Sequence, residues 1–395
     1  VMSNDKLIAD LAGTARKAAR TLVAASYEDR KSALLAIADS LIARQAEILA
    51  ANNEDMERGK ASGLNSQLLD RLMLNENRIQ GIAGGARKVA ALPNPLGNVL
   101  RQRKLENGLT LTQVTVPFGV IGMVYEARPN VTVDAAVILL MSGNAALLRG
   151  SSSAEKSNEV LVKALLNARG KVDLVIPRGS ASLIRMVVDE STVPTIETGA
   201  GVCHVYVDEK ADLEKALPIL INSKTHRPSV CNAAETLLVH EKVKDSFLPV
   251  ALKALHSASV KLHCDEDSLR IAKELNIPAE RATEESWSTE YGVLEMNVAV
   301  VPNLLAASDH ILKYGTNHTE AIVTESQESA DQFIALSDCA AVMVNASTRF
   351  TDGEEMGFGA EIGISNQKLH ARGPMGLEQM TTTTWIVRGD GQIRK

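Results

Sequence analysis

The feature that most constrains the fold is an alternation of short apolar segments with helical segments, which begins at residue 117. Residues 118–124 form an uninterrupted apolar run, 131–141 have the length and composition of a buried helix, and 145–148 form a second apolar run. A helix is expected over 154–167, behind three serines. Strands that are apolar on both faces and separated by helices are typical of parallel sheets covered on both sides. The sequence therefore predicts an α/β protein of doubly wound type.

The same alternation returns in the second half of the chain and predicts a second α/β domain. Its expected strands and helices are strands 236–239, 297–301, 321–324 and 341–345, and helices 243–255, 304–314 and 329–336. A chain of 395 residues also exceeds the size at which one hydrophobic core stops growing. Two or three domains are expected.

A helical segment and a hairpin precede the first alternation. Residues 5–89 have apolar positions at three and four residue spacing, which predicts successive helices. Pro93 and Pro95 are expected to end them. Residues 99–103 and 109–116 then flank Asn107-Gly108, a pair that suits a tight hairpin turn. The hairpin is expected to be an oligomerisation arm or a plain surface ribbon.

Composition excludes several classes of protein. The net charge of −6, without a basic stripe, argues against nucleic-acid binding. No apolar run reaches transmembrane length. Four cysteines lie far apart with no C-x-x-C pair, which suggests free thiols in a reducing cytoplasm. No metal site is expected, and residues 263–266 (His-Cys-Asp-Glu) are interpreted as a solvated loop. The glycine-rich fingerprints of dinucleotide and P-loop sites are also absent.

Cys231 is the candidate nucleophile. It follows Lys224 and Arg227 in a polar segment and precedes an apolar strand. Nearby positive charge favours the thiolate, which is the reactive form of cysteine. Free cysteines are also among the most buried residue types, so a small buried residue remains an equally good interpretation of the local sequence.

Six segments resemble those of a known family and decide between the two interpretations of Cys231. They are YEARPNVTVD (125–134), IPRG (176–179), GVCHVYVD (201–208), RPSVCN (227–232), NASTRFTDG (345–353) and QKLHARGPMGL (367–377). In this order they resemble the gamma-glutamyl phosphate reductases, a family of the aldehyde dehydrogenase superfamily. The resemblance covers nearly the whole chain. It makes Cys231 the nucleophile.

The resemblance also implies a domain organisation. It implies two doubly wound α/β domains and a small β oligomerisation arm. The cofactor-binding domain is expected over 1–97 and 117–224, with the tail returning at about 346–376. The catalytic domain is expected over 225–345, and the arm over 98–116 and 377–395.

The resemblance implies reduction of L-glutamyl 5-phosphate to L-glutamate 5-semialdehyde and phosphate, the second step of proline biosynthesis from glutamate. Cys231 is expected to form a thioester, with NADPH as the hydride donor. The Cys231 N–H and a side chain at Arg128 to Asn130 are candidates to hold the carbonyl oxygen. The expected cofactor-binding residues are Arg149, Gly150, Ser151, Ser152, Gly179, Ser180, Glu197 and Gly199. The expected substrate-binding residues are Arg227, Lys224, Thr348, Arg349, His370 and Arg372, because cations and glycine-rich turns suit anions.

Three alternatives remain open. An oxidising semialdehyde dehydrogenase of the same superfamily would use Cys231 as nucleophile and Glu197 as base. A cysteine hydrolase would pair Cys231 with His226 or His370. A non-enzymatic assembly protein would show no thiol hyperreactivity. The favoured interpretation implies a homo-oligomer, dimer or tetramer, and a possible transient contact with glutamate 5-kinase.

The resemblance departs from the family pattern at one point. Between Gly170 and Lys171 the family carries a further strand and helix, for which this chain has no residues. A parallel crossover needs about ten to twelve residues. A segment skipped in the sequence is therefore expected, since a true deletion would damage the cofactor cleft.

Overall fold

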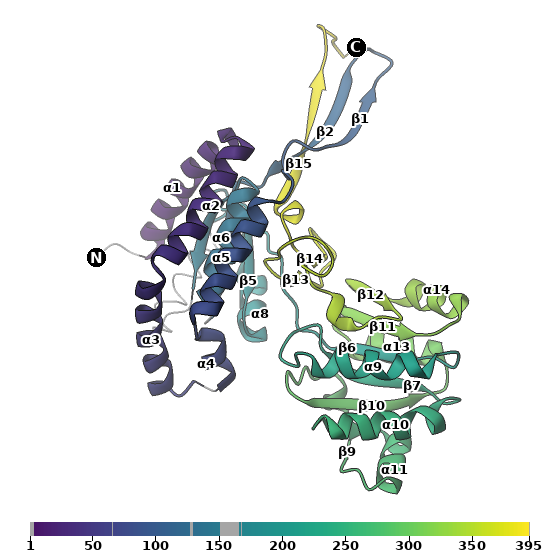
Figure 1. Ribbon diagram of the computed structural model, residues 1–395. Coiled ribbons are helices and arrows are strands. Elements are labelled where there is room, and N and C mark those ends of the chain that lie inside the picture. Colours follow the sequence, from purple (N-terminus) through teal and green to yellow (C-terminus); the bar gives the residue numbers. More distant parts are fainter. Residues whose placement is uncertain (1–3, 65, 127–128, 151–165, 167, 395) are drawn as a thin grey trace. The chain divides into compact units, whose positions relative to one another are not determined.

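The chain divides into two compact units. A computed structural model describes residues 4–64, 66–126, 129–150, 166 and 168–394 (Figure 1). Unit 1 comprises Val1–Thr198, Gly357–Gly363 and Pro374–Lys395, and unit 2 comprises Gly199–Met356 and Ile364–Gly373. Among the described helices, none is long and apolar enough to cross a membrane.

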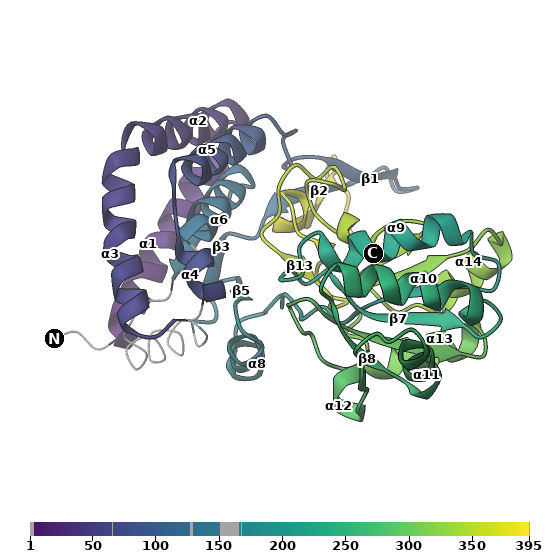
Figure 2. The ribbon, with the colours of Figure 1, turned by 60° about the horizontal axis from the view of Figure 1, so that its bottom comes forward.

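Unit 1 begins with the predicted run of helices. They are α1 (Asn4–Ala24), α2 (Tyr27–Ala43), α3 (Gln45–Ala61), α4 (Ser66–Leu72) and α5 (Glu76–Ala90). Ser26 and Asp29 form a reciprocal capping box at the start of α2, and the Asn75 side chain caps α5. These contacts satisfy backbone N–H groups that have no partner inside the helix. The α5 helix packs against α2 and against α6 (Pro129–Met141), and the three lie side by side in Figures 1 and 2.

A three-stranded parallel sheet lies beside these helices. Strand β3 (Val120–Tyr125) pairs with β4 (Ala145–Arg149) on one edge and with β5 (Leu174–Arg178) on the other. The small side chains Ala12, Ala15 and Ala19 of α1 pack into the core of this sheet. Helix α8 (Ala181–Glu190) follows β5 and contributes Val187 to that core. The predicted strands 118–124 and 145–148 and helix 131–141 are confirmed.

Residues on both sides of Gly170, the point of departure from the family pattern, form a tight turn. Lys171 and Val172 both donate backbone hydrogen bonds to the carbonyl of Ala168, and Gly170 has a φ of 85°. The positive φ that glycine tolerates allows this tight turn directly before β5. Arg16 of α1 then pairs with the Asp173 carboxylate at 2.8 Å. Residues 168–173 form a tight turn. The expected skipped segment stays a prediction. The expected helix 154–167 lies outside the described residues.

A separate three-stranded antiparallel sheet in unit 1 confirms the predicted hairpin. Strand β1 (Val99–Lys104) pairs with β2 (Thr110–Pro117), and Gly108 in the turn has a φ of 86°. Strand β15 (Thr381–Arg388) pairs along the other side of β2. The strand order β1-β2-β15 places Val99 and Trp385, both about half exposed, on the outer strands.

Unit 2 is built on a seven-stranded parallel sheet. Its order is β12-β11-β6-β7-β10-β8-β9. The strands are β6 (Cys203–Val207), β7 (Ala234–His240), β8 (Lys261–Cys264), β9 (Glu280–Arg281), β10 (Glu295–Val301), β11 (Thr319–Val323) and β12 (Ala341–Val344). The helices are α9 (Leu213–Thr225), α10 (Lys244–Ser257), α11 (Glu266–Glu274), α12 (Glu284–Trp287), α13 (Leu304–Tyr314) and α14 (Gln327–Leu336). Short elements complete the chain: β13 (Ile364–Ser365), β14 (Gly373–Pro374), and the 3₁₀ turns Thr348–Phe350 and Glu378–Met380.

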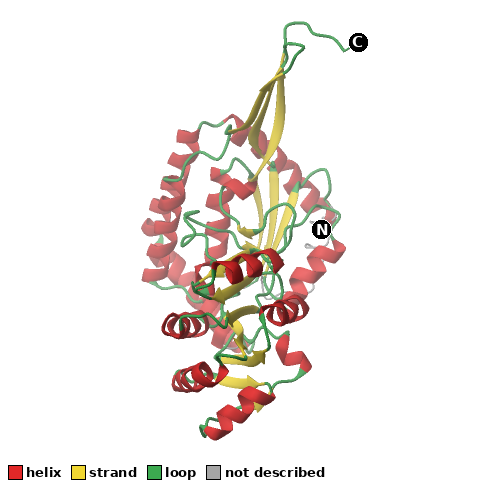
Figure 3. Ribbon diagram, turned by 90° about the vertical axis from the view of Figure 1, so that its right-hand side faces the viewer, coloured by secondary structure: helices red, strands yellow, loops and turns green. Residues whose placement is uncertain are grey.

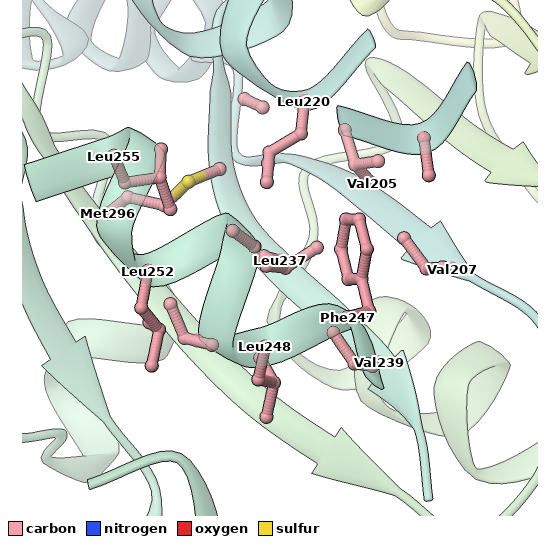
Figure 4. Close-up of a cluster of buried hydrophobic side chains, with 14 of the residues drawn as sticks. Val205, Val207, Leu220, Leu237, Val239, Phe247, Leu248, Leu252, Leu255 and Met296 are labelled. Atoms are coloured by element: carbon pink, nitrogen blue, oxygen red, sulfur yellow. The ribbon is translucent and has the colours of Figure 1, made fainter. Parts of the chain in front are cut away.

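Helices cover both faces of this sheet (Figure 3). Consecutive residues of β7 alternate between two cores: Leu237 and Val239 join the core with α9 and α10, and Leu238 joins the core with α13. Figure 4 shows Phe247, Leu248 and other α10 side chains packed against the strands. Both faces of β7 are therefore buried, as its continuous apolar sequence predicts.

Two expectations about unit 2 need correction. The predicted domain boundary at residue 224 is misplaced, because β6 pairs with β7 in the sheet that follows the cysteine. Unit 2 thus begins at Gly199. The solvated loop expected at 263–266 is also wrong in part. His263 and Cys264 belong to β8, Cys264 is fully buried, and Asp265 caps α11.

Candidate active site

Cys231 lies in a loop at the amino edge of the seven-stranded sheet. We call residues 226–233 the nucleophile loop; it connects the end of α9 to the start of β7. Cys231 is partly exposed, whereas Cys203 and Cys264 are buried. Burial raises the pKa of Cys203 well above its usual range, raises that of Cys264 to about 11 and raises that of Cys339 to about 12. Those three thiols are thereby held in the unreactive protonated form.

The backbone of Cys231 is held by the start of β6. The Cys203 thiol donates a hydrogen bond to the Cys231 carbonyl oxygen at 3.2 Å. Gly201 packs so closely that a Cβ at this position would lie 1.4 Å from the same oxygen. Only glycine leaves room for this approach. The sequence analysis did not single out Gly201, and its place at the start of the segment 201–208 was the available signal.

Two predicted substrate residues gather around Cys231. Arg349 donates from Nε to His226 Nδ1 at 3.3 Å and from Nη1 to the Asn232 side-chain oxygen. Burial lowers the pKa of Arg349 and the nearby carboxylate of Asp352 raises it; the positive charge of Arg227 lowers it further, and Cys231 raises it. Arg349 therefore interacts electrostatically with both Arg227 and Cys231. Arginine keeps its charge at neutral pH even so.

Hydrogen bonds fix the segment that carries Arg349. The Thr348 N–H donates to Ser223 Oγ at 3.2 Å, and Ser223 Oγ lies 3.0 Å from Ser347 Oγ. The Asn232 amide donates to the Thr351 carbonyl at 2.8 Å. Thr348 is buried, and within the described part of the chain its hydroxyl has no hydrogen-bond partner. Sequence reasoning missed Asn232, although it follows the nucleophile directly.

The other predicted substrate residues lie in different surroundings. Lys224 is fully buried, 2.6 Å from the carboxylate of Glu235, so in this arrangement it is not available to a substrate anion. Burial lowers the pKa of Lys224 and raises that of Glu235, and each partner offsets the effect on the other. Arg372 pairs with Asp338 at 2.9 Å, two residues after the exposed His370.

Unit 1 carries Asn130 and all of the predicted cofactor residues except Gly199. The Asn130 amide donates to Asp134 at 3.0 Å on the first turns of α6. Arg149 Nη1 donates to the carbonyl of Gly150, and its buried Nε has no partner among the described residues. Arg128, Ser151 and Ser152 lie outside the described residues.

The start of α8 already holds an anion. The Ser180 N–H and hydroxyl both donate to the Glu126 carboxylate at 2.9 Å, and a Cβ at Gly179 would lie 2.8 Å from its carboxyl carbon. Backbone N–H groups at a helix start favour anions. The hydrogen-bond donors at Gly179 and Ser180 therefore fit a phosphate group. In this structure the Glu126 carboxylate occupies the position that a phosphate would take.

The remaining two predicted cofactor residues belong to different units. Glu197 is partly exposed and belongs to unit 1, next to Thr198, whose hydroxyl donates to the Pro177 carbonyl at 3.0 Å. Gly199 is the first residue of unit 2. A Cβ there would lie 1.9 Å from the Asn366 side chain, so Gly199 permits a close packing contact.

Comparison with known proteins identifies the family. No protein-family model matches the chain. It is 52% identical to the gamma-glutamyl phosphate reductase of Kineococcus radiotolerans over 96% of this chain and 94% of that protein. It is also 52% identical to that of Thermobifida fusca, over 97% and 98%. These alignments span 408 and 412 positions, so the relatives carry residues that have no counterpart here.

Solved structures agree with this assignment. The crystal structure of gamma-glutamyl phosphate reductase from Thermotoga maritima is 43% identical, with a TM-score of 0.91 over 97% of this chain and 99% of that one. An acetylating aldehyde dehydrogenase from Geobacillus thermoglucosidasius, 15% identical with a TM-score of 0.69 over 99% and 98%, shares the fold. The expected aldehyde dehydrogenase-like architecture is confirmed, and the chain belongs to the gamma-glutamyl phosphate reductase family.

Proposed function

We propose that the protein reduces L-glutamyl 5-phosphate to L-glutamate 5-semialdehyde and phosphate, the second step of proline biosynthesis. The observation that carries this proposal is the grouping of Cys231 with Arg227 and Arg349 in a chain 52% identical to enzymes of that name. A thiol beside two guanidinium groups suits an anionic acyl substrate, because guanidinium binds phosphate and carboxylate strongly.

In this mechanism Cys231 attacks the acyl carbon. The Cys231 sulfur forms a bond to that carbon, phosphate leaves with the electron pair of the broken C–O bond, and a thioester remains on the cysteine. Arg227 and Arg349 stabilise the departing phosphate. Negative charge on the carbonyl oxygen is stabilised by the Cys231 N–H, with the Asn130 side chain as the second candidate donor and Arg128 as the third.

A nicotinamide cofactor, NADPH, supplies the hydride that converts the thioester to the aldehyde when it is bound. Its proposed contacts are Arg149, Gly150, Ser151, Ser152, Gly179, Ser180, Glu197 and Gly199. The unpaired Arg149 Nε and the anion-binding start of α8 support this choice. Ser180 would bind phosphate oxygens of NADPH once the Glu126 carboxylate has moved away. Arg149 would bind the 2′-phosphate of NADPH.

The remaining substrate contacts follow from the two ends of glutamyl phosphate. The phosphate subsite is assigned to Arg227 and Arg349, and Thr348 adds an unpaired hydroxyl. His370 and Arg372 are proposed for the α-carboxylate. The β1-β2-β15 sheet has two outer strands open to pairing, so we propose a homo-oligomer, dimer or tetramer, formed through this arm. The four free thiols fit the cytoplasm, and a contact with glutamate 5-kinase stays a prediction.

The reverse reaction tests the proposal directly. Purified protein with glutamate 5-semialdehyde and NADP⁺ is expected to form NADPH, measured by absorbance, only when inorganic phosphate is present, because phosphate must cleave the thioester. NADPH formation that does not depend on phosphate would instead establish the oxidising dehydrogenase, with Glu197 as base. No reaction under either condition would contradict both.

Substitution of the site arginines is expected to weaken substrate selectively. Arg349→Met and Arg227→Met should each cost about 1.5 to 3 kcal/mol of substrate binding, because each removes a charge-assisted hydrogen bond, while the Kd for NADPH stays unchanged. Competitive inhibition by free phosphate, measured in initial-rate assays, should be lost in the variant that removes the phosphate contact. Arg270→Met, at an exposed ion pair on α11, is the matched control. If phosphate inhibits both variants like the unchanged protein, neither arginine binds phosphate.

A further inference from the structure

The ion pair between Lys224 and Glu235 has no role in the mechanism above. Lys224 is in the last turn of α9, and Glu235 is the second residue of β7. Their charged atoms lie 2.6 Å apart, and neither side chain has exposed surface. The second oxygen of Glu235 accepts a hydrogen bond from the Gly292 N–H at 3.3 Å.

Stability alone does not account for this pair. Removing two charges from water costs several kcal/mol per ion, and their attraction rarely does more than offset that cost. Apolar residues of similar volume in place of a buried pair are often neutral or stabilising. We therefore look for a role of this pair that depends on the direction of its contacts.

The Lys224–Glu235 pair lies at the two ends of the nucleophile loop, which indicates such a role. Lys224 lies two positions before the first residue of the nucleophile loop, and Glu235 lies two positions after its last residue, so the pair joins its two ends. The Gly292 contact ties a third segment to the same carboxylate. Lys224 and Glu235 both act electrostatically on Cys203, whose thiol donates to the Cys231 carbonyl. The pair thus lies next to the groups that hold the Cys231 backbone.

We propose that Lys224 and Glu235 are positioning residues, which fix both ends of the nucleophile loop and thereby hold the Cys231 thiol in its reactive arrangement. Neither residue touches the substrate. The directional contacts, Lys224 Nζ to Glu235 and Glu235 to the Gly292 N–H, set the register of the loop. This inference rests on the proposed function only in taking Cys231 as the nucleophile.

Thiol alkylation tests the inference without substrate or cofactor. The full chain is treated with iodoacetamide, and labelling of the Cys231 peptide is followed by mass spectrometry alongside the Tm. Lys224→Met alone should lower the Tm, because it leaves a buried carboxylate unpaired. The double variant Lys224→Met with Glu235→Leu should recover the Tm but still be alkylated at least about tenfold more slowly, because a thiol that is displaced from the nearby arginine charges is less often a thiolate.

The double variant is decisive, because a purely structural pair would recover both properties together. Alkylation of Cys231 at the unchanged rate in a double variant with normal Tm would overturn the proposal. Lys215→Met is the matched control: Lys215 lies on the same helix and pairs with Glu325 at 2.8 Å, half exposed, so neither readout should change. Because alkylation needs no acyl phosphate, this test remains informative even if the assigned reaction is wrong.

Discussion

Replacement of Cys231 by serine is expected to reduce turnover by more than about a thousandfold, as loss of a covalent nucleophile does in other enzymes. A serine hydroxyl is almost entirely protonated near pH 7 and lacks the nucleophilicity of a thiolate. The variant should fold normally, because Cys231 is partly exposed, serine has the same branching as cysteine, and the Cys231 carbonyl still accepts from Cys203. The measurement is phosphate-dependent NADPH formation, with NADPH binding followed separately by fluorescence.

The matched control for this experiment is Cys339→Ala. Cys339 is a partly exposed thiol in the same unit, and its pKa is raised to about 12 by burial, so it should not contribute a thiolate. That variant should retain activity within about twofold. If Cys231→Ser keeps even a tenth of the unchanged activity, Cys231 is not the nucleophile.

The Gly201→Ala variant is expected to lose at least about a hundredfold in kcat, although Gly201 contacts no substrate. The added Cβ would lie 1.4 Å from the Cys231 carbonyl oxygen and 2.4 Å from its carbonyl carbon. Both atoms are backbone, so neither can rotate away, and the nucleophile itself must move. The kcat and the rate of Cys231 alkylation should both decrease, and the affinity for the cofactor should not.

Gly81→Ala provides the matched substitution. Gly81 is an exposed residue within α5, and a Cβ there meets nothing within 4 Å. Alanine in a helix interior is favoured over glycine by about 0.5 to 1 kcal/mol, so this variant should be slightly more stable and fully active. Equal activity of the Gly201 and Gly81 variants would show that the contact with Cys231 does not position the thiol.

Local pattern predicted most elements, and the failures have physical causes. The Asn107-Gly108 turn and the apolar runs of β3 and β7 predicted their structures, because period and turn chemistry are local properties. Strand β8 was missed because the polar His263 lies within its four residues. The boundary near Gly199 was misplaced because only the pairing of β6 with β7 assigns β6 to unit 2.

The predicted site residues stay predictions, and the structure shows environments that the sequence does not reveal. Arg349, chosen from a tail turn rich in cations, interacts electrostatically with Arg227 and Cys231. The same reasoning made Lys224 a substrate contact, because a sequence does not reveal that a lysine is fully buried against Glu235. Asn232 and Gly201 went unnoticed because their contacts join segments far apart in the chain.

The pairing of β15 with β2 has a consequence for biosynthesis. The hydrogen bond between Gln113 and Thr383 joins residues separated by 270 positions. Contacts of such separation form slowly, because the intervening chain must be closed into a loop first. A ribosome releases the N-terminal part first, so β1 and β2 emerge long before their partner strand. Most of unit 2 is continuous, from Gly199 to Met356, and it can fold meanwhile. The arm is therefore completed only after β15 has been synthesised, and until then one edge of β2 is exposed to other nascent chains.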